Sequence, residues 1–426
     1  YKISYIVGKN MSKLIVHGGN KISGKLRLES AKNAVLPMIA GAILTKEQVV
    51  IKNCPKISDV LNMIKILDQL GVSAEFDEDD LVINSKGICS YTVPESLSKE
   101  LRSSIYFMGA LVSRVKKARI SYPGGCDIGV RPIDLHVKGL RELGVSVTEI
   151  FGEIICTTDR IKGKEIYLDF PSVGATENLM LIAVLADGKT EIHNAAREPE
   201  IIDFMRFLNS MGAKVYGAGT STILIEGVKK LHGTVYLPME DRIECGTYLL
   251  TAAITGGEIE ISNCNAKNIS PLIHKLCDNT CKISINNDII YLKSGKVKKA
   301  FSFSTGPHPF FPTDMQPQAM ALCCVSSGVS VVTEKVFERR FAHVNDFVKM
   351  GADITLKSNV AIVNGVKRLT GASVTANDLR GGVALVLAGL VADGKTVVNN
   401  FQLVERGYYN LESKLCSLGA NVKKKG

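Results

Sequence analysis

The amino-acid sequence predicts an α/β fold built from six repeated units of about 70 residues each. Two observations predict this: a glycine that recurs after an amphipathic helical pattern, and an apolar helical segment that opens each unit. The glycine follows Leu or Met and precedes Val or Ala. One interval is doubled and contains a degenerate copy at 276–283, where Thr280 replaces the glycine. The recurring residues are Gly71, Gly144, Gly212, Gly351 and Gly419.

Each unit has the same predicted order of elements. An apolar helix comes first, then an alternating strand, an amphipathic second helix, the glycine as its C-terminal cap, and two short strands. Three such modules, each with its own buried helix, could close around one core. The predicted first helices include 34–44, 105–112, 179–185, 248–254 and 383–391. The strands include 49–52, 118–121, 190–194, 258–263 and 396–400, and the second helices include 60–70 and 201–211.

Length and composition indicate sizeable hydrophobic cores. A chain of 426 residues suggests about two or three domains, and 46% of its residues are hydrophobic against 22% charged. The longest apolar run, 34–44, includes Pro37 and is shorter than the about 18 residues of a membrane-spanning helix. Residues 1–10 lack the apolar stretch and cleavage site of a secretory signal, and Met11 is interpreted as the natural start.

The cysteines are scattered and form no Cys-x-x-Cys pair, although the chain contains 11 of them. Only Cys277 with Cys281 and Cys323 with Cys324 lie close together, and neither pair has the histidines that would complete a zinc site. The sequence therefore predicts no metal site and no disulfide framework. Reduced thiols indicate the cytosol.

The chain carries a formal net charge of +10, with 52 Lys and Arg against 42 Asp and Glu. Such an excess fits either nucleic acid or a small polyanionic substrate. The sequence has no Trp, and its basic residues form no stripe interleaved with aromatic residues. The basic run at 423–425 is interpreted as a solvated tail, so a small anion is favoured over nucleic acid.

A polar cluster begins the first helix of each unit at nearly matching positions. The free N–H groups and positive dipole of a helix N-terminus attract anions, so these clusters point to an anion-binding site. Taken singly, each cluster is more often an ordinary cap. Cations at three equivalent positions oppose the helix dipole, however, and indicate a further role. The clusters are 30–33, 101–103, 172–174, 241–242, 313–314 and 378–380, with cations at Lys32, Arg102 and Arg380.

Two residues carry candidate chemistry. Cys126 lies in the glycine- and proline-rich segment 122–132, which predicts an exposed loop whose thiol is activated by Arg131. A cysteine taken at random is more often a small buried hydrophobe, but the flanking glycines argue against burial. Asp314 begins a helix after a proline-rich approach and is either a cap or a general base. The glycine-rich segment 217–220 joins two strands and is interpreted as a turn rather than a dinucleotide loop.

These motifs, in their order, resemble those of the UDP-N-acetylglucosamine 1-carboxyvinyltransferases of the enolpyruvyl transferase family. The resemblance covers nearly the whole chain. It implies a two-domain inside-out α/β barrel, with three units in each domain, helices buried and sheets outside. The first domain comprises 11–32 and 240–426, the second comprises 33–239, and 1–10 is an extra N-terminal segment. The motifs are 30–33, 123–126 with 131–132, 172–178, 241–242, 311–316, 378–380 and 406–408.

The resemblance implies transfer of the enolpyruvyl group of phosphoenolpyruvate to the 3'-hydroxyl of UDP-N-acetylglucosamine, with release of phosphate. This is the first committed step of peptidoglycan synthesis. The implied protein is a bacterial cytoplasmic enzyme that needs no metal or organic cofactor, neither binds nucleic acid nor inserts into membranes, and is the target of fosfomycin. Its active site is expected in the cleft between the domains, where cations stabilise the anionic substrates.

The family's functional residues carry over to matching positions in this chain. Cys126 corresponds to the loop cysteine that reacts with phosphoenolpyruvate and is implicated in proton delivery to C3, and Asp314 corresponds to the carboxylate that deprotonates the 3'-hydroxyl. The catalytic set is Cys126, Asp314, Lys32 and Arg406. The phosphoenolpyruvate set is Lys32, Asn33, Arg102, Cys126, Arg131, Arg380 and Arg406. The UDP-N-acetylglucosamine set is Asn33, Arg102, Arg131, Pro132, Ile133, Asp134, Leu135, Ser172, Val173, Gly174, Asp314, Val336 and Phe337.

Two positions depart from the family pattern. Phe170 stands where many members have a lysine, which would remove one uridine contact, and Asp127 places a charge that opposes activation of the neighbouring thiol. Two alternatives remain open: a 5-enolpyruvylshikimate-3-phosphate synthase-like transferase, and a non-catalytic paralogue that binds UDP-sugars and regulates the pathway. The cysteine loop and the segment 172–178 weigh against the first alternative. The intact catalytic set weighs against the second.

Overall fold

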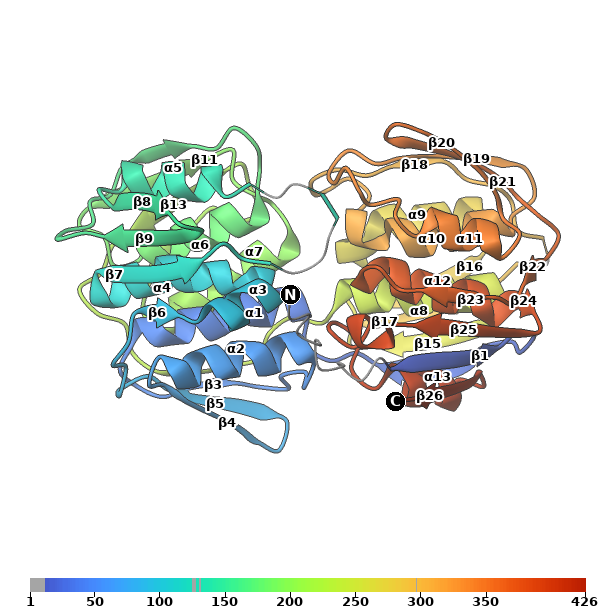
Figure 1. The fold of residues 1–426 in the computed structure, drawn as a ribbon, viewed down its shortest axis with the longest axis horizontal. Helices are drawn as coiled ribbons and strands as arrows, with labels where there is room; N and C mark the ends of the chain where they lie inside the picture. The colour runs from blue at the N-terminus through green and yellow to red at the C-terminus, as the bar shows by residue number, and fades with distance from the viewer. Residues whose placement is uncertain (1–11, 125–127, 130–131, 296) are drawn as a thin grey trace, which may run out of the picture.

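The computed structural model describes residues 12–124, 128–129, 132–295 and 297–426. These residues form two lobes that lie side by side (Figure 1). One hydrophobic core spans Ala31 to Leu231, in what we call the inserted lobe. A second core combines Leu14 to Leu28 with Ile243 to Val422, in what we call the terminal lobe because strands from both ends of the chain pack in it. The domain boundaries drawn from the sequence stay a prediction.

Six four-stranded sheets and one two-stranded sheet are present among the described residues. Each four-stranded sheet begins with a parallel pair and continues with two antiparallel pairings, so one arrangement is repeated six times. Each lobe holds three of these sheets. The predicted α/β fold of six repeated units is therefore confirmed.

The inserted lobe contains three units, each with two main helices and four strands. The first unit comprises β14 (Thr234–Tyr236), α1 (Lys32–Gly41), β3 (Val49–Ile51), α2 (Ser58–Gln69), β4 (Ser73–Asp77) and β5 (Asp80–Asn84). The second comprises β6 (Thr92–Val93), α3 (Glu95–Glu100), α4 (Tyr106–Val115), β7 (Lys117–Ser121), α5 (Asp134–Glu142), β8 (Ser146–Ile150) and β9 (Glu153–Thr157). The third comprises β10 (Glu165–Tyr167), α6 (Val173–Ala183), β11 (Lys189–His193), α7 (Pro199–Ser210), β12 (Lys214–Tyr216) and β13 (Thr222–Glu226).

The terminal lobe contains the other three units and a small sheet of β22 (Leu369–Thr370) and β24 (Ala392–Asp393). The fourth unit comprises β2 (Ser23–Arg27), α8 (Arg242–Thr255), β15 (Glu258–Ser262), α9 (Ser270–Asp278), β16 (Lys282–Asn286) and β17 (Ile289–Lys293). The fifth comprises β18 (Phe303–Ser304), α10 (Gln316–Cys324), β19 (Val329–Thr333), α11 (Val344–Lys349), β20 (Asp353–Lys357) and β21 (Val360–Asn364). The sixth comprises β23 (Ser373–Thr375), α12 (Leu379–Val391), β25 (Lys395–Asn399), α13 (Leu411–Ser417), β26 (Asn421–Lys425) and β1 (Lys13–His17).

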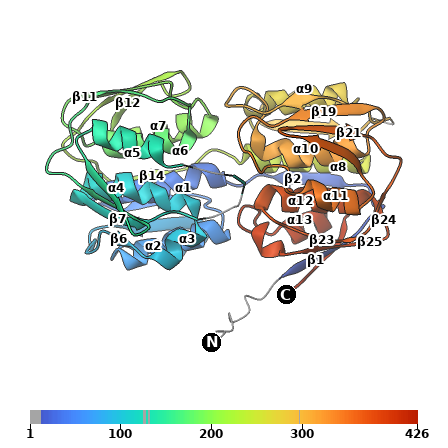
Figure 2. The ribbon, with the colours of Figure 1, turned by 45° about the horizontal axis from the view of Figure 1, so that its top comes forward.

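The first helix of each unit forms the centre of its lobe. α8, α10 and α12 pack against one another in the terminal lobe, and α1, α4 and α6 do so in the inserted lobe. Every residue of α10 is buried, as are nearly all residues of α8 and α12. A helix that is apolar on all sides is stable only inside a core. Figures 1 and 2 show these helices toward the middle of each lobe with the sheets around them, which confirms the inside-out arrangement.

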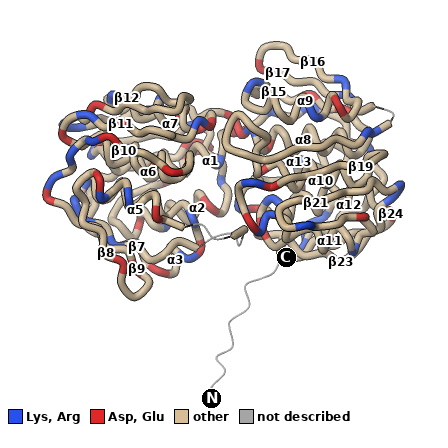
Figure 3. The backbone as a smooth tube through the Cα atoms, turned by 90° about the horizontal axis from the view of Figure 1, so that it is seen from above, with Lys and Arg blue, Asp and Glu red and all other residues tan. Residues whose placement is uncertain are grey.

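The sheets have one face on the core and one toward solvent. In β11 the buried residues Thr190 and Ile192 alternate with Lys189 and Glu191, the pattern of a half-buried antiparallel strand. Charged residues of both signs occur along both lobes, including the region where the lobes meet (Figure 3). The apolar positions of each strand therefore cover the central helices, while the polar positions face outward.

Strands are exchanged where the chain passes between the lobes. β2 precedes α1 in the chain but pairs with β15 in the terminal lobe, whereas β14 precedes α8 but pairs with β3 in the inserted lobe. The two crossing segments also contact each other, since the Ala31 N–H donates to the Met239 carbonyl at 2.8 Å and the Asp241 N–H to the Glu29 carbonyl at 3.1 Å. β1 lies between β25 and β26, at the opposite end of the sequence.

The recurring glycines end the second helices in the left-handed backbone conformation. Gly71, Gly144, Gly212, Gly351 and Gly419 have φ values of 81°, 87°, 93°, 89° and 93°. Thr280, at the degenerate copy, has a φ of 80°. The structure therefore confirms that 276–283 is a copy of the same repeated helix end, although Thr280 replaces its glycine. A β-branched residue is strained in this conformation, and its presence costs stability.

Thr280→Gly should raise the free energy of unfolding by about 1 kcal/mol, because glycine adopts this φ without a Cβ clash. The gain is reduced by loss of the hydrogen bond from the Thr280 hydroxyl to the Val297 carbonyl. Gly351→Thr is the matched control, since a Cβ at Gly351 meets no heavy atom within 4 Å and only the backbone strain is added. Urea unfolding of both variants measures the effect. Changes of the same sign in both would contradict this account.

Candidate active site

A cleft of about 620 Å³ is lined by residues of both lobes. The N-terminal ends of the first helices of all six units line it. Since a helix N-terminus carries the positive pole of the helix dipole, the cleft favours anionic ligands. The residues at these ends are Lys32 at α1, Arg102 and Ser103 before α4, Ser172 to Gly174 at α6, Arg242 at α8, Thr313 and Asp314 before α10, and Leu379 and Arg380 at α12.

Three of the polar clusters at these ends are helix caps. The Ser172 hydroxyl accepts one hydrogen bond from the first turn of α6, and the carboxylates of Asp241 and Asp378 each accept two from the first turns of α8 and α12. Asp314 differs, because the turn Thr313–Met315 has Pro312 at its N-cap and no side-chain cap bond. The interpretation of Asp314 as a cap is therefore wrong, and its carboxylate contacts side chains instead.

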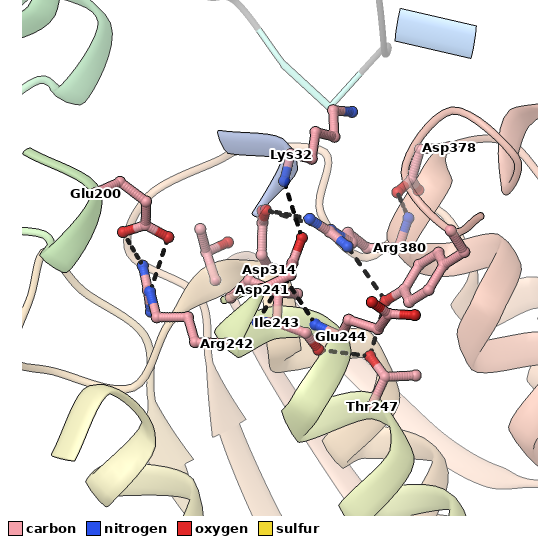
Figure 4. Close-up of polar contacts among 12 residues, drawn as sticks. Lys32, Glu200, Asp241, Arg242, Ile243, Glu244, Thr247, Asp314, Asp378 and Arg380 are labelled. Carbon is pink, nitrogen blue, oxygen red and sulfur yellow. Dashed lines mark hydrogen bonds and ion pairs between the residues drawn. The ribbon is translucent and has the colours of Figure 1, made fainter. Parts of the chain in front are cut away.

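The Asp314 carboxylate lies between two guanidinium groups. Arg340 Nη2 donates to Oδ1. Arg380 donates to Oδ2 through Nε at 3.2 Å and Nη2 at 3.1 Å (Figure 4). The side chains of Arg340 and Arg380 are 2% and 3% exposed, whereas that of Asp314 is 28% exposed and faces the cleft. Burial alone would raise the pKa of Asp314, but Arg380, Arg340 and Lys32 outweigh it and hold the pKa well below its usual range.

Asp59, in the first turn of α2, joins two of the predicted site cations. Lys32 Nζ lies 2.7 Å from Asp59 Oδ2, and Arg406 donates to the same carboxylate through Nε at 2.8 Å and Nη2 at 3.3 Å. Asp59 belongs to the inserted lobe and Arg406 to the terminal lobe, so the pair also connects the lobes. Burial would raise the pKa of Asp59, but Lys32 and Arg406 outweigh it and lower the pKa.

A second charged group connects the lobes at the start of α7. Glu200 accepts hydrogen bonds from Arg242 Nε at 2.9 Å and Nη2 at 3.1 Å (Figure 4), and Glu198 accepts one from the His308 backbone N–H at 3.1 Å. Burial raises the pKa of Glu198, and it raises the pKa of Glu177 well above the ordinary value. The Arg242 guanidinium group therefore pairs with Glu200 and interacts electrostatically with Glu198, both at the start of α7.

Most predicted site residues line this cleft. Ile133 is the exception among those described, because its side chain packs in the core of the inserted lobe. Cys126 and Arg131 lie outside the described residues. The predicted residues that line the cleft are Lys32, Asn33, Arg102, Pro132, Asp134, Leu135, Ser172, Val173, Gly174, Asp314, Val336, Phe337, Arg380 and Arg406.

Several charged residues of the cleft were missed by the sequence reasoning. Arg340, which pairs with Asp314, lies in a connection between β19 and α11, where no repeated pattern marks it. Asp59 begins a second helix, and only the first helices were compared. Glu198 and Glu200 flank Pro199, which marks a helix start and could have drawn attention to them.

Two features are absent from the described residues: a cluster able to hold a metal ion and a helix able to span a membrane. No group of three or more His, Cys, Asp and Glu residues within them is placed to hold a metal ion. Within the same residues, no helix has the length and apolar character needed to span a bilayer.

The chain belongs to the EPSP synthase (3-phosphoshikimate 1-carboxyvinyltransferase) family, whose model matches residues 16–415. Among curated proteins it is similar to UDP-N-acetylglucosamine 1-carboxyvinyltransferase 2 of Caldanaerobacter subterraneus subsp. tengcongensis, at 49% identity over 97% of this chain and 99% of the relative. It is also similar to the protein of that name from Clostridium tetani, at 46% identity over 97% of this chain and 99% of the relative.

Solved structures support the fold. The enolpyruvyl transferase NikO from Streptomyces tendae superposes with a TM-score of 0.88 at 23% identity, covering 97% of this chain and 99% of that chain. EPSP synthase from Acinetobacter baumannii superposes with a TM-score of 0.75 at 18% identity, covering 98% and 100%. At these identities the likeness establishes the enolpyruvyl transferase fold and nothing finer.

Asp59→Asn should lower the free energy of unfolding at pH 7 by about 3 kcal/mol, because it leaves Lys32 and Arg406 buried without their shared anion. The pKa of Asp59 is lowered by folding, so its contribution is present above the unfolded pKa of about 3.9 and disappears as the pH falls through the folded pKa. The difference from the wild-type chain should therefore shrink below pH 4.

Urea unfolding at neutral and acid pH measures this difference. Asp68→Asn, an exposed position on the same helix, is the control and should change stability by less than about 0.5 kcal/mol. Equal losses in the two variants, or a difference that does not depend on pH, would contradict the role given to Asp59.

Proposed function

We propose that this chain transfers the enolpyruvyl group of phosphoenolpyruvate to the 3'-hydroxyl of UDP-N-acetylglucosamine, with release of phosphate. The observation that supports this most is the set of cations gathered at helix N-termini around Asp314, in a cleft between two lobes. Both substrates are anionic, and fixed cations in a cleft stabilise them and the charge that develops in the transition state. The names of relatives 45–49% identical over nearly their full length support the same activity.

The proposed reaction has an addition and an elimination step. The 3'-hydroxyl oxygen bonds to C2 of phosphoenolpyruvate, its proton passes to Asp314, and C3 receives a proton from the Cys126 thiol. The tetrahedral intermediate then loses phosphate from C2 and a proton from C3, which restores the double bond. Lys32, Arg380 and Arg406 are proposed to bind the carboxylate and phosphate throughout, which orients C2 toward the hydroxyl.

The surroundings of Asp314 set a condition on its role as the base. While Arg340 and Arg380 both pair with it, the carboxylate is ionised but only weakly basic, because protonation would leave two guanidinium groups facing a neutral acid. Phosphoenolpyruvate brings further negative charge to Arg380, one of these two guanidinium groups. Its binding would raise the proton affinity of Asp314, so that the base becomes competent once the donor substrate is in place.

The remaining lining residues are proposed to bind the nucleotide sugar. Pro132, Asp134 and Leu135 come from one segment, and the N-terminal end of α6 supplies N–H groups for a diphosphate. Phe170 lines the cleft beside these residues and is 44% exposed, so an aromatic ring occupies the position where the lysine was expected. This ring offers a stacking surface in place of a charged contact.

Cys126 and Arg131 lie outside the described residues, and their roles rest on the motif in which they occur. Gly124 and Ile128, on either side, are described. The Ile128 carbonyl accepts a hydrogen bond from the Arg339 N–H at 3.1 Å, so Ile128 contacts the other lobe. We propose that Cys126 is the thiol that reacts with phosphoenolpyruvate and that Arg131 binds its anionic groups.

A shikimate-type acceptor is the second candidate, because the family model that matches the chain is that of EPSP synthase. A phosphate-release assay with each acceptor separates the two, and absence of release with both would favour a non-catalytic protein that binds UDP-sugars. We further propose that the chain acts in the bacterial cytoplasm in the first committed step of peptidoglycan synthesis. No nucleic acid, metal or organic cofactor takes part in the proposed reaction.

Asp314→Asn should lower turnover by at least about a hundredfold, because an amide of nearly equal volume cannot accept the proton. Binding of UDP-N-acetylglucosamine, measured by calorimetry, should stay within a few-fold of wild type. Asp169→Asn is the control, since Asp169 also lines the cleft but is an exposed carboxylate paired with Lys138. Turnover within tenfold of wild type in Asp314→Asn would remove Asp314 from the mechanism.

Fosfomycin, an epoxide, should alkylate Cys126 alone. Cys89, Cys277 and Cys416 are exposed thiols that serve as internal controls, and the other seven described cysteines are buried. Cys126→Asp should escape alkylation and keep turnover, since a carboxyl group can still relay a proton, whereas Cys126→Ala should lose turnover. Intact mass with peptide mapping and phosphate release measure the two parts. Labelling spread over several cysteines, or full activity in Cys126→Ala, would overturn the assignment.

A further inference from the structure

Tyr408 is a buried tyrosine whose hydroxyl lies at the meeting point of three side chains. Arg380 Nη1 lies 3.2 Å from it, Thr247 Oγ1 2.7 Å and Gln318 Nε2 3.3 Å. Arg380 is the same residue that pairs with Asp314 through Nε and Nη2. The Tyr408 hydroxyl thus contacts the Nη1 edge of the guanidinium group, and the Asp314 carboxylate contacts the edge formed by Nε and Nη2.

The direction of these hydrogen bonds follows from the groups involved. Guanidinium and amide nitrogens only donate, so the Tyr408 oxygen accepts from Arg380 and from Gln318, whose Nε2 also lies 3.3 Å from Thr247 Oγ1. The Tyr408 proton is then donated to the Thr247 hydroxyl, whose own proton is donated to the Ile243 carbonyl at 2.8 Å. A directed chain therefore runs from Arg380 through two hydroxyl groups to the backbone of α8.

We propose that Tyr408 is a positioning residue, which fixes the guanidinium plane of Arg380 so that Asp314 and the donor substrate both meet it in one orientation. Three of the five N–H groups of Arg380 are accounted for by Asp314 and Tyr408, and these bonds fix both ends of the planar group. Gln318 supports the same arrangement, since its Nε2 also donates to the Asp314 backbone carbonyl at 3.0 Å. The substrate named here rests on the proposed function.

Tyr408→Phe removes only the oxygen atom and leaves a buried N–H of Arg380 without its acceptor. Loss of a hydrogen bond to a charged group in this setting corresponds to about a tenfold to hundredfold effect on the function it supports. Tyr248→Phe is the matched control. Tyr248 is also buried, lies on α8 next to Thr247, and its hydroxyl has no hydrogen-bond partner among the described residues.

We expect Tyr408→Phe to weaken phosphoenolpyruvate binding and to lower kcat, each about tenfold, with UDP-N-acetylglucosamine binding unchanged. Tyr248→Phe should change none of these. Thr247→Val, which removes the acceptor of the Tyr408 proton, should produce part of the same loss. Thr247→Ser keeps the hydroxyl group and should retain wild-type phosphoenolpyruvate binding and kcat. The double variant Tyr408→Phe/Thr247→Val should be no worse than Tyr408→Phe alone, because the two positions act through one chain of bonds.

Additive losses in the double variant, or equal losses of both substrates, would show that Tyr408 supports the fold only and would overturn the proposal. Binding of inorganic phosphate, measured by calorimetry on folded variants, gives a readout that does not need turnover, with Arg380→Gln as the reference for complete loss of this contact. Phosphate affinity lowered in Tyr408→Phe but not in Tyr248→Phe would uphold the proposal even where neither acceptor substrate is turned over. Equal phosphate affinity in both variants would overturn it.

Discussion

The burial of six helices on nearly all sides is the constraint on which the rest of this structure depends. A helix enclosed in this way meets its surroundings only at its ends, and the N–H groups of its first turn must find partners there. Three such helices in each lobe present these ends to one cleft. The electrostatic character of the cleft is therefore a consequence of how the cores are built, and the side chains at the helix starts refine it.

The cations of the cleft are balanced by carboxylates in the described structure. Asp314 faces Arg340 and Arg380, Asp59 faces Lys32 and Arg406, and Glu200 faces Arg242. An anionic substrate that enters must share these cations with the carboxylates. The carboxylates are held in place by helix turns. When an anionic substrate binds, each cation therefore interacts with both its carboxylate and the substrate.

The repeat pattern made the fold predictable to a large extent. The glycines at helix ends and the apolar first helices located all six units, and Thr280 shows that the backbone conformation was kept where the glycine was not. The exchange of β2 and β14 could not be read locally, since each strand adjoins in sequence a helix of the other lobe. A local pattern carries no information about which distant strand completes a sheet.

The candidate site was predictable only in part, for a similar reason. Lys32, Arg102 and Arg380 share one phase of the repeat, so comparing units revealed them. Arg340 contacts Asp314, and Asp59 contacts Arg406. Neither Arg340 nor Asp59 stands at the start of a first helix, so comparing the units does not reveal them. Residues that serve a site by holding another side chain leave no periodic signal. Tyr408 and Thr247, whose hydroxyl groups form the chain of hydrogen bonds that starts at Arg380, are residues of this kind.

The place of β1 has a consequence for how the chain is made. This strand is made before the whole of the inserted lobe, yet both of its neighbours, β25 and β26, are made after that lobe. The inserted lobe, by contrast, needs nothing beyond β14 to complete its three sheets. During synthesis the inserted lobe can therefore fold while the terminal lobe still has an open sheet edge, which exposes that lobe to wrong pairings until β25 and β26 have been made.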